Sequence, residues 1–261
     1  MDYYREFLEK TELLLDDFLK RNETKLYVGR VSMRKAVKNY LWSFLILGGY
    51  REFYNCGRKE GIDSQILERQ LCRELSDRFE MVVENKKISL NDGRYEAFEV
   101  LKSYVDSVVV LCKNSRQMGY WCPIVSKLTS PVLMLCNYEC EEEEDESELG
   151  DHVAIVELSV LHEKFIQNDY LEKCFPCVFA YANLFTMIMD IVTPSCVMVM
   201  EGCHEEAEVL AAIAKSMGVE SVCYQQGWPS VMHTRFCNMG YDRFMTWGKV
   251  LINCGSRIIR Q

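Results

Sequence analysis

Proline is scarce in this sequence and is missing from its amino-terminal part. None of the five prolines lies within residues 1 to 103. Because proline interrupts helices, a stretch without it whose apolar residues recur at helical spacing is expected to be helical. Three segments show this spacing: 4–21, 33–50 and 63–79. We predict helices there, the second ending at Gly48-Gly49 and the third capped by Asp63 or Ser64.

Long apolar runs, a signal peptide and a basic excess are also missing. No apolar run approaches the roughly 18 residues that a membrane span needs. The chain opens on an amphipathic segment, and its thirteen cysteines fit free thiols in a reducing compartment better than a disulfide framework. A formal net charge of -9 argues against a nucleic-acid partner. We predict a cytoplasmic protein without a membrane span. Peripheral contact with a membrane and the oligomeric state stay open.

The sequence contains only weak patterns of residues that could ligate a metal. The CFPC segment, with Cys174 and Cys177, has the spacing of half a zinc site, but a second such pair is missing. Residues 139–148 carry eight acidic side chains, which leaves the rest of the chain at a formal charge of -1. This run lacks the glycine and the spacing of a calcium loop. We therefore predict no metal site and interpret the run as a solvated loop.

Beyond residue 104 the pattern changes to short apolar runs rich in β-branched residues. Such runs, without polar alternation, are typical of strands buried on both faces of a parallel sheet. They are found within 106–114, 130–138, 152–159, 195–202 and 220–227. Helices are expected between them, over about 161–191 and over 203–219, the latter ending at Gly218. We predict an α/β fold, with a helical region over 1–103 and a Rossmann-like parallel sheet with flanking helices over 104–261. No GxGxxG motif follows the first strand, so the dinucleotide fingerprint is absent.

Polar residues follow several of these strands directly. In an open parallel sheet, ligands bind at the carboxyl ends of the strands. Glu201 follows one strand, and Gln225, Gln226 and Gly227 follow the next. Asn114 and Arg116 follow the first, where a plain polar turn is the alternative interpretation. We expect these side chains to meet at one edge of the sheet and to contact a substrate.

The last ninety residues also carry a family resemblance. A strand ending in Gln225-Gln226-Gly227 is followed by Asp242, Phe244, Trp247 and Gly248. This arrangement resembles the amino-terminal, acceptor-side domain of GT-B fold glycosyltransferases that build bacterial surface polysaccharides. There a glutamine-histidine-glycine triplet precedes an aspartate-aromatic-tryptophan-glycine stretch. The similarity covers about 105–255 in architecture and about fifty residues in motif, and related nucleotide-sugar epimerases share the layout.

The resemblance implies transfer of a sugar from a nucleotide donor to the hydroxyl of a glycan acceptor, without a cofactor bound by this chain. Glutamine replaces histidine at position 226 and cannot act as a base. Glu201 or His233 is then the candidate catalytic base, and Arg235 the candidate phosphate contact. The alternatives are ordinary ones: Glu201 as an acid at the start of a helix, and His233 and Arg235 as surface-loop residues.

Whether the chain is an enzyme stays open at this point. Transferases of this type continue into a second Rossmann-like domain that contacts the nucleotide sugar, and these 261 residues do not supply it. We therefore expect the chain alone neither to transfer nor to hydrolyse nucleotide sugars. Two alternatives remain: a non-catalytic module that binds a glycan or a protein, and an epimerase-like protein.

Overall fold

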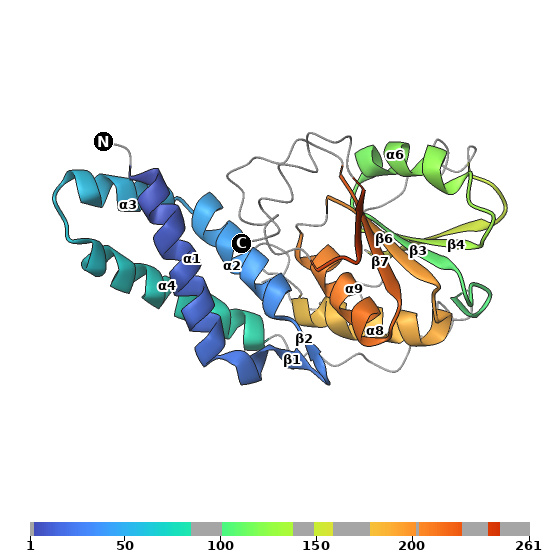
Figure 1. The fold of residues 1–261 in the computed structure, drawn as a ribbon, viewed down its shortest axis with the longest axis horizontal. Helices are drawn as coiled ribbons and strands as arrows, with labels where there is room; N and C mark the ends of the chain where they lie inside the picture. Colours follow the sequence, from blue (N-terminus) through green and yellow to red (C-terminus); the bar gives the residue numbers. More distant parts are fainter. Residues whose placement is uncertain are drawn as a thin grey trace.

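A computed structural model describes residues 3–84, 101–137, 149–158, 178–201, 204–225 and 240–245. The amino-terminal part is helical, as predicted (Figure 1). Its helices are α1 (Tyr4–Arg21), α2 (Arg34–Leu47), α3 (Tyr50–Lys59) and α4 (Ser64–Glu84). Asp63 caps α4, since its Oδ1 accepts the Gln65 N–H at 2.7 Å. None of the described helices is long and apolar enough to cross a bilayer.

Two features of this part were not predicted. Helix α3 follows α2 directly, because Gly49 adopts a left-handed conformation (φ +80°) that changes the direction of the chain and starts a new helix instead of a loop. The other is a short hairpin, β1 (Tyr27–Val28) and β2 (Val31–Ser32), which follows the 3-10 turn η1 (Glu23–Leu26). Strands of two residues are too short to show any periodicity in a sequence.

The second part is a six-stranded, fully parallel sheet, which confirms the predicted Rossmann-like α/β fold. Its order is β5-β4-β3-β6-β7-β8. The strands are β3 (Val108–Cys112), β4 (Val132–Cys136), β5 (Val153–Glu157), β6 (Cys196–Met200), β7 (Glu220–Tyr224) and β8 (Arg243–Met245). The chain first builds outward from β3 to β5, and then returns to the other side of β3 to add β6, β7 and β8.

Helices cover both faces of the sheet (Figure 1). Helix α6 (Ser115–Val125) packs on the face that carries Val110, Met134 and Met198. Helices α8 (Val178–Val192) and α9 (Glu205–Ser216) pack on the other face. Side chains alternate between the two faces along each strand, so both faces of β3 and β4 are apolar and buried. Gly218 follows α9 with φ +74°, as predicted for its carboxyl-terminal end.

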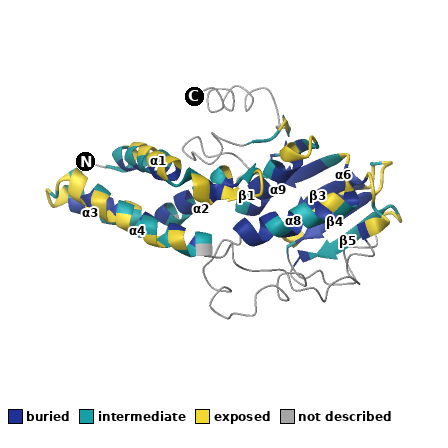
Figure 2. Cartoon of the chain, turned by 90° about the horizontal axis from the view of Figure 1, so that it is seen from below, coloured by how far each residue is buried: buried dark blue, intermediate teal, exposed yellow. Residues whose placement is uncertain are grey.

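The amino-terminal helices share a hydrophobic core with α8 and α9. One continuous cluster of buried side chains extends from Phe7 in α1 to Cys223 in β7. It joins α2 to α9 and α4 to α8. The dark, buried faces of these helices meet in Figure 2. The predicted division of the chain at residue 103 therefore crosses a continuous core, and the boundary itself stays a prediction.

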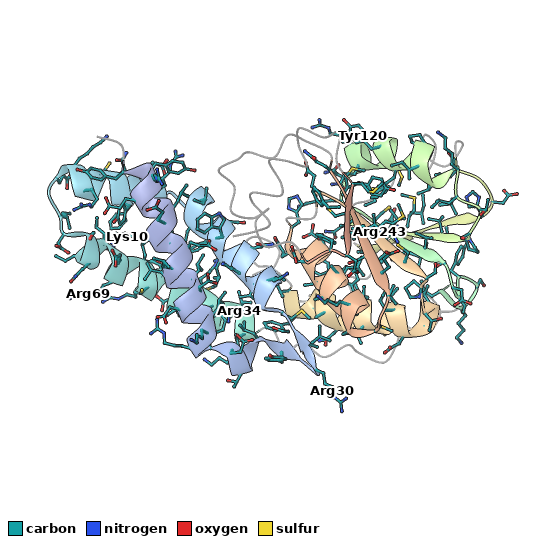
Figure 3. All side chains as sticks on the ribbon, viewed as in Figure 1. Lys10, Arg30, Arg34, Arg69, Tyr120 and Arg243 are labelled. Carbon is teal, nitrogen blue, oxygen red and sulfur yellow. The ribbon has the colours of Figure 1, made fainter. Side chains whose placement is uncertain are left out.

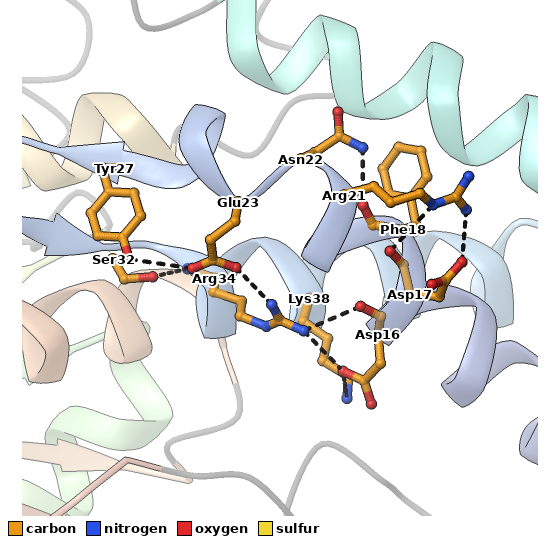
Figure 4. A network of polar contacts seen from close by, with 10 residues as sticks. All are labelled: Asp16, Asp17, Phe18, Arg21, Asn22, Glu23, Tyr27, Ser32, Arg34 and Lys38. Atoms are coloured by element: carbon orange, nitrogen blue, oxygen red, sulfur yellow. Dashed lines mark hydrogen bonds and ion pairs between the residues drawn. The ribbon is translucent and has the colours of Figure 1, made fainter.

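Ion pairs tie α1 to the start of α2 (Figure 4). Arg34 contacts Glu23 at 2.6 Å and Asp16 at 3.6 Å. Lys38, one turn further, contacts Asp16 at 2.9 Å and Glu12. This network fixes the hairpin and the first turn of α2 against α1.

Asp242 joins the edge strand β8 to β7. Its Oδ2 accepts the backbone N–H of Ser221 at 2.9 Å and the Ser221 hydroxyl at 2.8 Å. The Ser221 backbone N–H, and then its hydroxyl, hold the pKa of Asp242 below 3.8, its ordinary value. Asp242 is thus a structural residue of the sheet edge, since these two bonds both hold β8 beside β7 and stabilise its charged form.

Replacing Asp242 with alanine should destabilise the protein by about 1–2 kcal/mol, because two hydrogen bonds to a charged acceptor are lost. Since the pKa is lowered on folding, the wild-type advantage is present above pH 3.8 and is lost as the pH falls through the folded-state pKa. Urea unfolding at several pH values measures both effects. Asp17→Ala, which removes an exposed pair with Arg21 on α1, is the control and should cost less than about 0.5 kcal/mol.

Candidate functional site at the carboxyl edge of the sheet

Open parallel sheets bind ligands in a crevice at the point where the strand order reverses, and in this sheet that point lies between β3 and β6. These two neighbouring strands are where the order of the sheet reverses, because the connection after β3 leads to β4 and that after β6 leads to β7 on the opposite side. Ligands of open parallel sheets bind outside the carboxyl ends of the strands at this point. The residues that leave β3 and β6 there are Lys113 and Glu201.

Four charged or titratable side chains meet at this point, and we call them the switch-point cluster: Lys113, Glu201, His204 and Glu206. Lys113 Nζ lies 2.9 Å from His204 Nδ1 and 3.3 Å from Glu206 Oε1. His204 Nε2 lies 3.6 Å from Glu201 Oε2. The cluster therefore joins the end of β3 to the end of β6 and to the first turn of α9.

The contacts of His204 define its tautomer. An ammonium group can only donate hydrogen bonds, so Lys113 donates to Nδ1 and the neutral ring carries its proton on Nε2. That Nε2–H faces the Glu201 carboxylate. His204 is thereby a connector between Lys113 and Glu201, and its lone pair is already occupied. Of the two carboxylates in the cluster, Glu201 is the one beside His204 and the less buried one.

The buried and exposed members of the cluster have different roles. The Glu206 side chain is 6% exposed, so it needs the Lys113 ammonium as a counter-ion. The Glu201 side chain is 34% exposed and can reach a ligand. Two carboxylates and one ammonium give the cluster an excess of hydrogen-bond acceptors, which suits hydroxyl groups better than phosphate.

Glu201 has an unusual backbone conformation, with φ +64°. Left-handed conformations are disfavoured for residues with a side chain. Its N–H donates to the carbonyl of Tyr224 at 2.8 Å, so the pairing of β6 with β7 continues one residue beyond the strand. Glu201 is therefore part of neither β6 nor α9, and the alternative that it is a first-turn acid of that helix does not describe its position.

The end of β3 is held by the start of α6. Asn114 is the N-cap, and its Oδ1 accepts the Gln117 N–H at 3.0 Å. Gln117 in turn accepts the backbone N–H of Lys113 at 2.9 Å through its Oε1. Trp121, fully buried, donates from its ring N–H to the Leu111 carbonyl at 3.2 Å. These bonds fix the backbone from which the Lys113 side chain extends.

The structure describes some of the other predicted site residues and not the rest. Gln225 lies at the same edge after β7, buried, with its N–H donating to the Met245 carbonyl at 3.0 Å. Asn114 is an exposed capping residue and Arg116 an exposed residue in the first turn of α6. The remaining four candidates lie outside the described residues: Gln226, Gly227, His233 and Arg235. Trp247 and Gly248 also lie outside them.

Sequence reasoning missed three members of the cluster: Lys113, His204 and Glu206. His204 was not among the predicted site residues, and it stands at the N-cap position of α9 without a capping hydrogen bond from its side chain. Lys113 was not singled out, although a charged residue directly after a fully buried strand was an available signal. Its importance depends on β3 lying beside β6, and strand order is not visible in a sequence.

Metal-binding groups do not gather in the described part of the chain. None of its histidine, cysteine and acidic side chains forms a cluster of three or more that could hold a metal ion. None of the seven described cysteines is joined to another described residue by a disulfide bond.

Comparison with known proteins assigns this chain to no family. No protein-family model matches this sequence, and no curated protein matches it either. The fold and the switch-point cluster are therefore the features of this chain that bear on its function.

Proposed function

We propose that this chain is a glycosyltransferase-like domain of the acceptor side, whose switch-point cluster binds a hydroxyl group of a glycan. The observation that carries the proposal is the carboxylate of Glu201, aligned by His204 and Lys113 at the point where the sheet order reverses. The motif resemblance around Gln225 to Gly248 supports the same class of protein.

The chemistry assigned to the cluster is general base catalysis. In sugar transfer, an acceptor hydroxyl oxygen forms a bond to the anomeric carbon while the bond from that carbon to the nucleotide diphosphate breaks. The hydroxyl proton then needs an acceptor, and Glu201 is the exposed carboxylate of the cluster. The Nε2–H of His204 faces this carboxylate at 3.6 Å, and the Lys113 ammonium keeps the imidazole in that tautomer.

Replacing Glu201 with alanine should weaken the binding of the cognate glycan by about tenfold or more, because a charged acceptor of a ligand hydroxyl is lost. Screening the purified chain on a glycan array finds the ligand, and titration calorimetry with that glycan measures the change. Glu205→Ala is the matched control, since Glu205 is a neighbouring acid on α9 outside the cluster. Equal affinity for both variants would remove Glu201 from the site.

A second variant separates catalysis from binding. Glu201→Gln keeps the shape and the hydrogen-bonding oxygen but is not a base. If Glu201 is the base, this variant binds the glycan and transfers sugar from a nucleotide donor at least about a hundredfold more slowly than the wild type. Absence of transfer by the wild type, with glycan binding intact, favours the alternative of a non-catalytic glycan-binding module.

A further inference from the structure

A second candidate site lies where the amino-terminal hairpin and α2 meet α9. A cavity of about 360 Å³ is formed there by residues of β2, of α2 and of α9, together with Gly240. This volume is in the range of cavities that bind one small organic molecule. It begins one turn along α9 from the switch-point cluster, since the Glu208 N–H donates to the His204 carbonyl at 3.1 Å.

The walls of this cavity are basic. Four cationic side chains line it: Arg30, Arg34, Lys35 and Lys215. Figure 3 labels Arg30 at the hairpin and Arg34 at the beginning of α2. Arg34 is compensated by Glu23 and Asp16, as described above. The other three cations take part in none of the ion pairs within 4 Å that connect described residues. Their charges are therefore available to a ligand.

One acidic residue, Glu208, also lines the cavity. Its side chain is almost completely buried, with the residue 2% exposed, and its Oε1 has no hydrogen-bond partner among the described residues. A buried carboxyl oxygen without a partner is rare, because it loses the hydrogen bonds of water without replacement. At a cavity wall, this oxygen is accounted for if a ligand supplies the partner.

The protonation of Glu208 favours an anion in the cavity. Burial raises the pKa of this carboxyl to about 8, although Lys35, the Gly240 N–H and the Asn39 side chain act in the opposite direction. At neutral pH the group is therefore protonated, adds no negative charge and can donate a hydrogen bond. The Lys35 ammonium lies close to the backbone at Gly240, since a Cβ there would be 3.0 Å from Lys35 Nζ.

We propose that this cavity is a binding site for a small phosphorylated metabolite of the sugar-phosphate class. Arg30, Lys35 and Lys215 would surround the phosphate, and the Glu208 carboxyl would donate to one of its oxygens. The apolar side chains of Val31, Ala211 and Ala212 would face the carbon skeleton. The site is separate from the switch-point cluster and does not require it.

Calorimetric titration with glucose 6-phosphate, glucose and inorganic phosphate tests the proposal. We expect glucose 6-phosphate to bind, glucose not to bind, and inorganic phosphate to bind at least about tenfold more weakly than the ester, since it lacks the skeleton contacts. The double variant Arg30→Gln/Lys215→Gln should weaken binding of the ester at least about tenfold, because two charge-assisted contacts are lost.

The matched control is Lys20→Gln/Lys127→Gln, which removes the same charge from exposed positions outside the cavity. It should bind glucose 6-phosphate as the wild type does. Equal weakening in both double variants would show a general charge effect and overturn the site. No binding of the ester at millimolar concentration would overturn it too, and equal affinity for inorganic phosphate would overturn the sugar-phosphate class.

Discussion

Replacing Glu208 with glutamine should stabilise the protein by roughly 3–5 kcal/mol above about pH 8 and leave its stability nearly unchanged near pH 4. The cause is burial, which raises the pKa of this carboxyl from 4.5 to about 8 in the folded state. The folded protein then holds a proton that the unfolded chain releases between these values. Wild-type stability therefore falls, relative to the glutamine variant, as the pH rises from about 4.5 to 8. Glutamine imitates the protonated carboxyl and has no such dependence.

Urea unfolding of both proteins over this pH range measures the difference. Glu205→Gln is the control, because it removes a negative charge from the same helix end at a less buried position. It should change stability by less than about 1 kcal/mol through the helix dipole. A difference between wild type and Glu208→Gln that is the same at acid and alkaline pH would contradict the protonated, buried carboxyl.

Replacing Lys113 with methionine should cost about 2–3 kcal/mol at neutral pH. Glu206, whose side chain is 6% exposed, would keep its charge in a buried position without its counter-ion at 3.3 Å. The loss stays below the full cost of breaking a buried pair because the Lys113 side chain is 35% exposed. The double variant Lys113→Met/Glu206→Gln should regain most of the stability, since the uncompensated charge is then removed.

Chemical unfolding of Lys113→Met, of Glu206→Gln and of the double variant, each compared with the wild type, forms a thermodynamic cycle for this pair. Lys20→Met, at an exposed position of α1, gives the effect of losing a surface lysine. Stability of Lys113→Met equal to that of Lys20→Met would mean that solvent replaces the lysine at Glu206. The switch-point cluster would then be loosely held, and the role of Lys113 in orienting His204 would be lost with it.

The sheet was predictable because each of its central strands is a short apolar run that no other local structure explains. Five of the six strands of the parallel sheet fall within the predicted segments, and Gly218 follows the helix predicted over 203–219, as expected. The strand β8 has only three residues and an exposed-to-intermediate pattern, so it gives no such signal. Helix α3 was missed because a glycine pair is compatible both with the end of a helix and with a turn between two helices.

The candidate sites were less predictable than the fold. Glu201 and Gln225 were found by their places after strands, and both lie at the carboxyl edge. The partners of Glu201 depend on β3 lying beside β6, and the basic cavity depends on α2 packing against α9. Neither arrangement leaves a local pattern. Glu208 in particular looks like any acid of an amphipathic helix until its burial is known.

The strand order also determines which parts of the nascent chain are without their packing partners while the ribosome is still synthesising the rest. Strand β3 is completed at Cys112, and its neighbour β4 follows soon after, but β6 begins only at Cys196. At a synthesis rate of about 5–20 residues per second, the edge of β3 that pairs with β6 stays unpaired for on the order of ten seconds. During this time the unpaired backbone groups of β3 can accept a strand from another chain. The apolar faces of α2 and α4 wait longer still, because their partners α9 and α8 emerge only after β5. The nascent chain is therefore most open to misassembly, and to chaperone binding, between the completion of β5 and the arrival of β6.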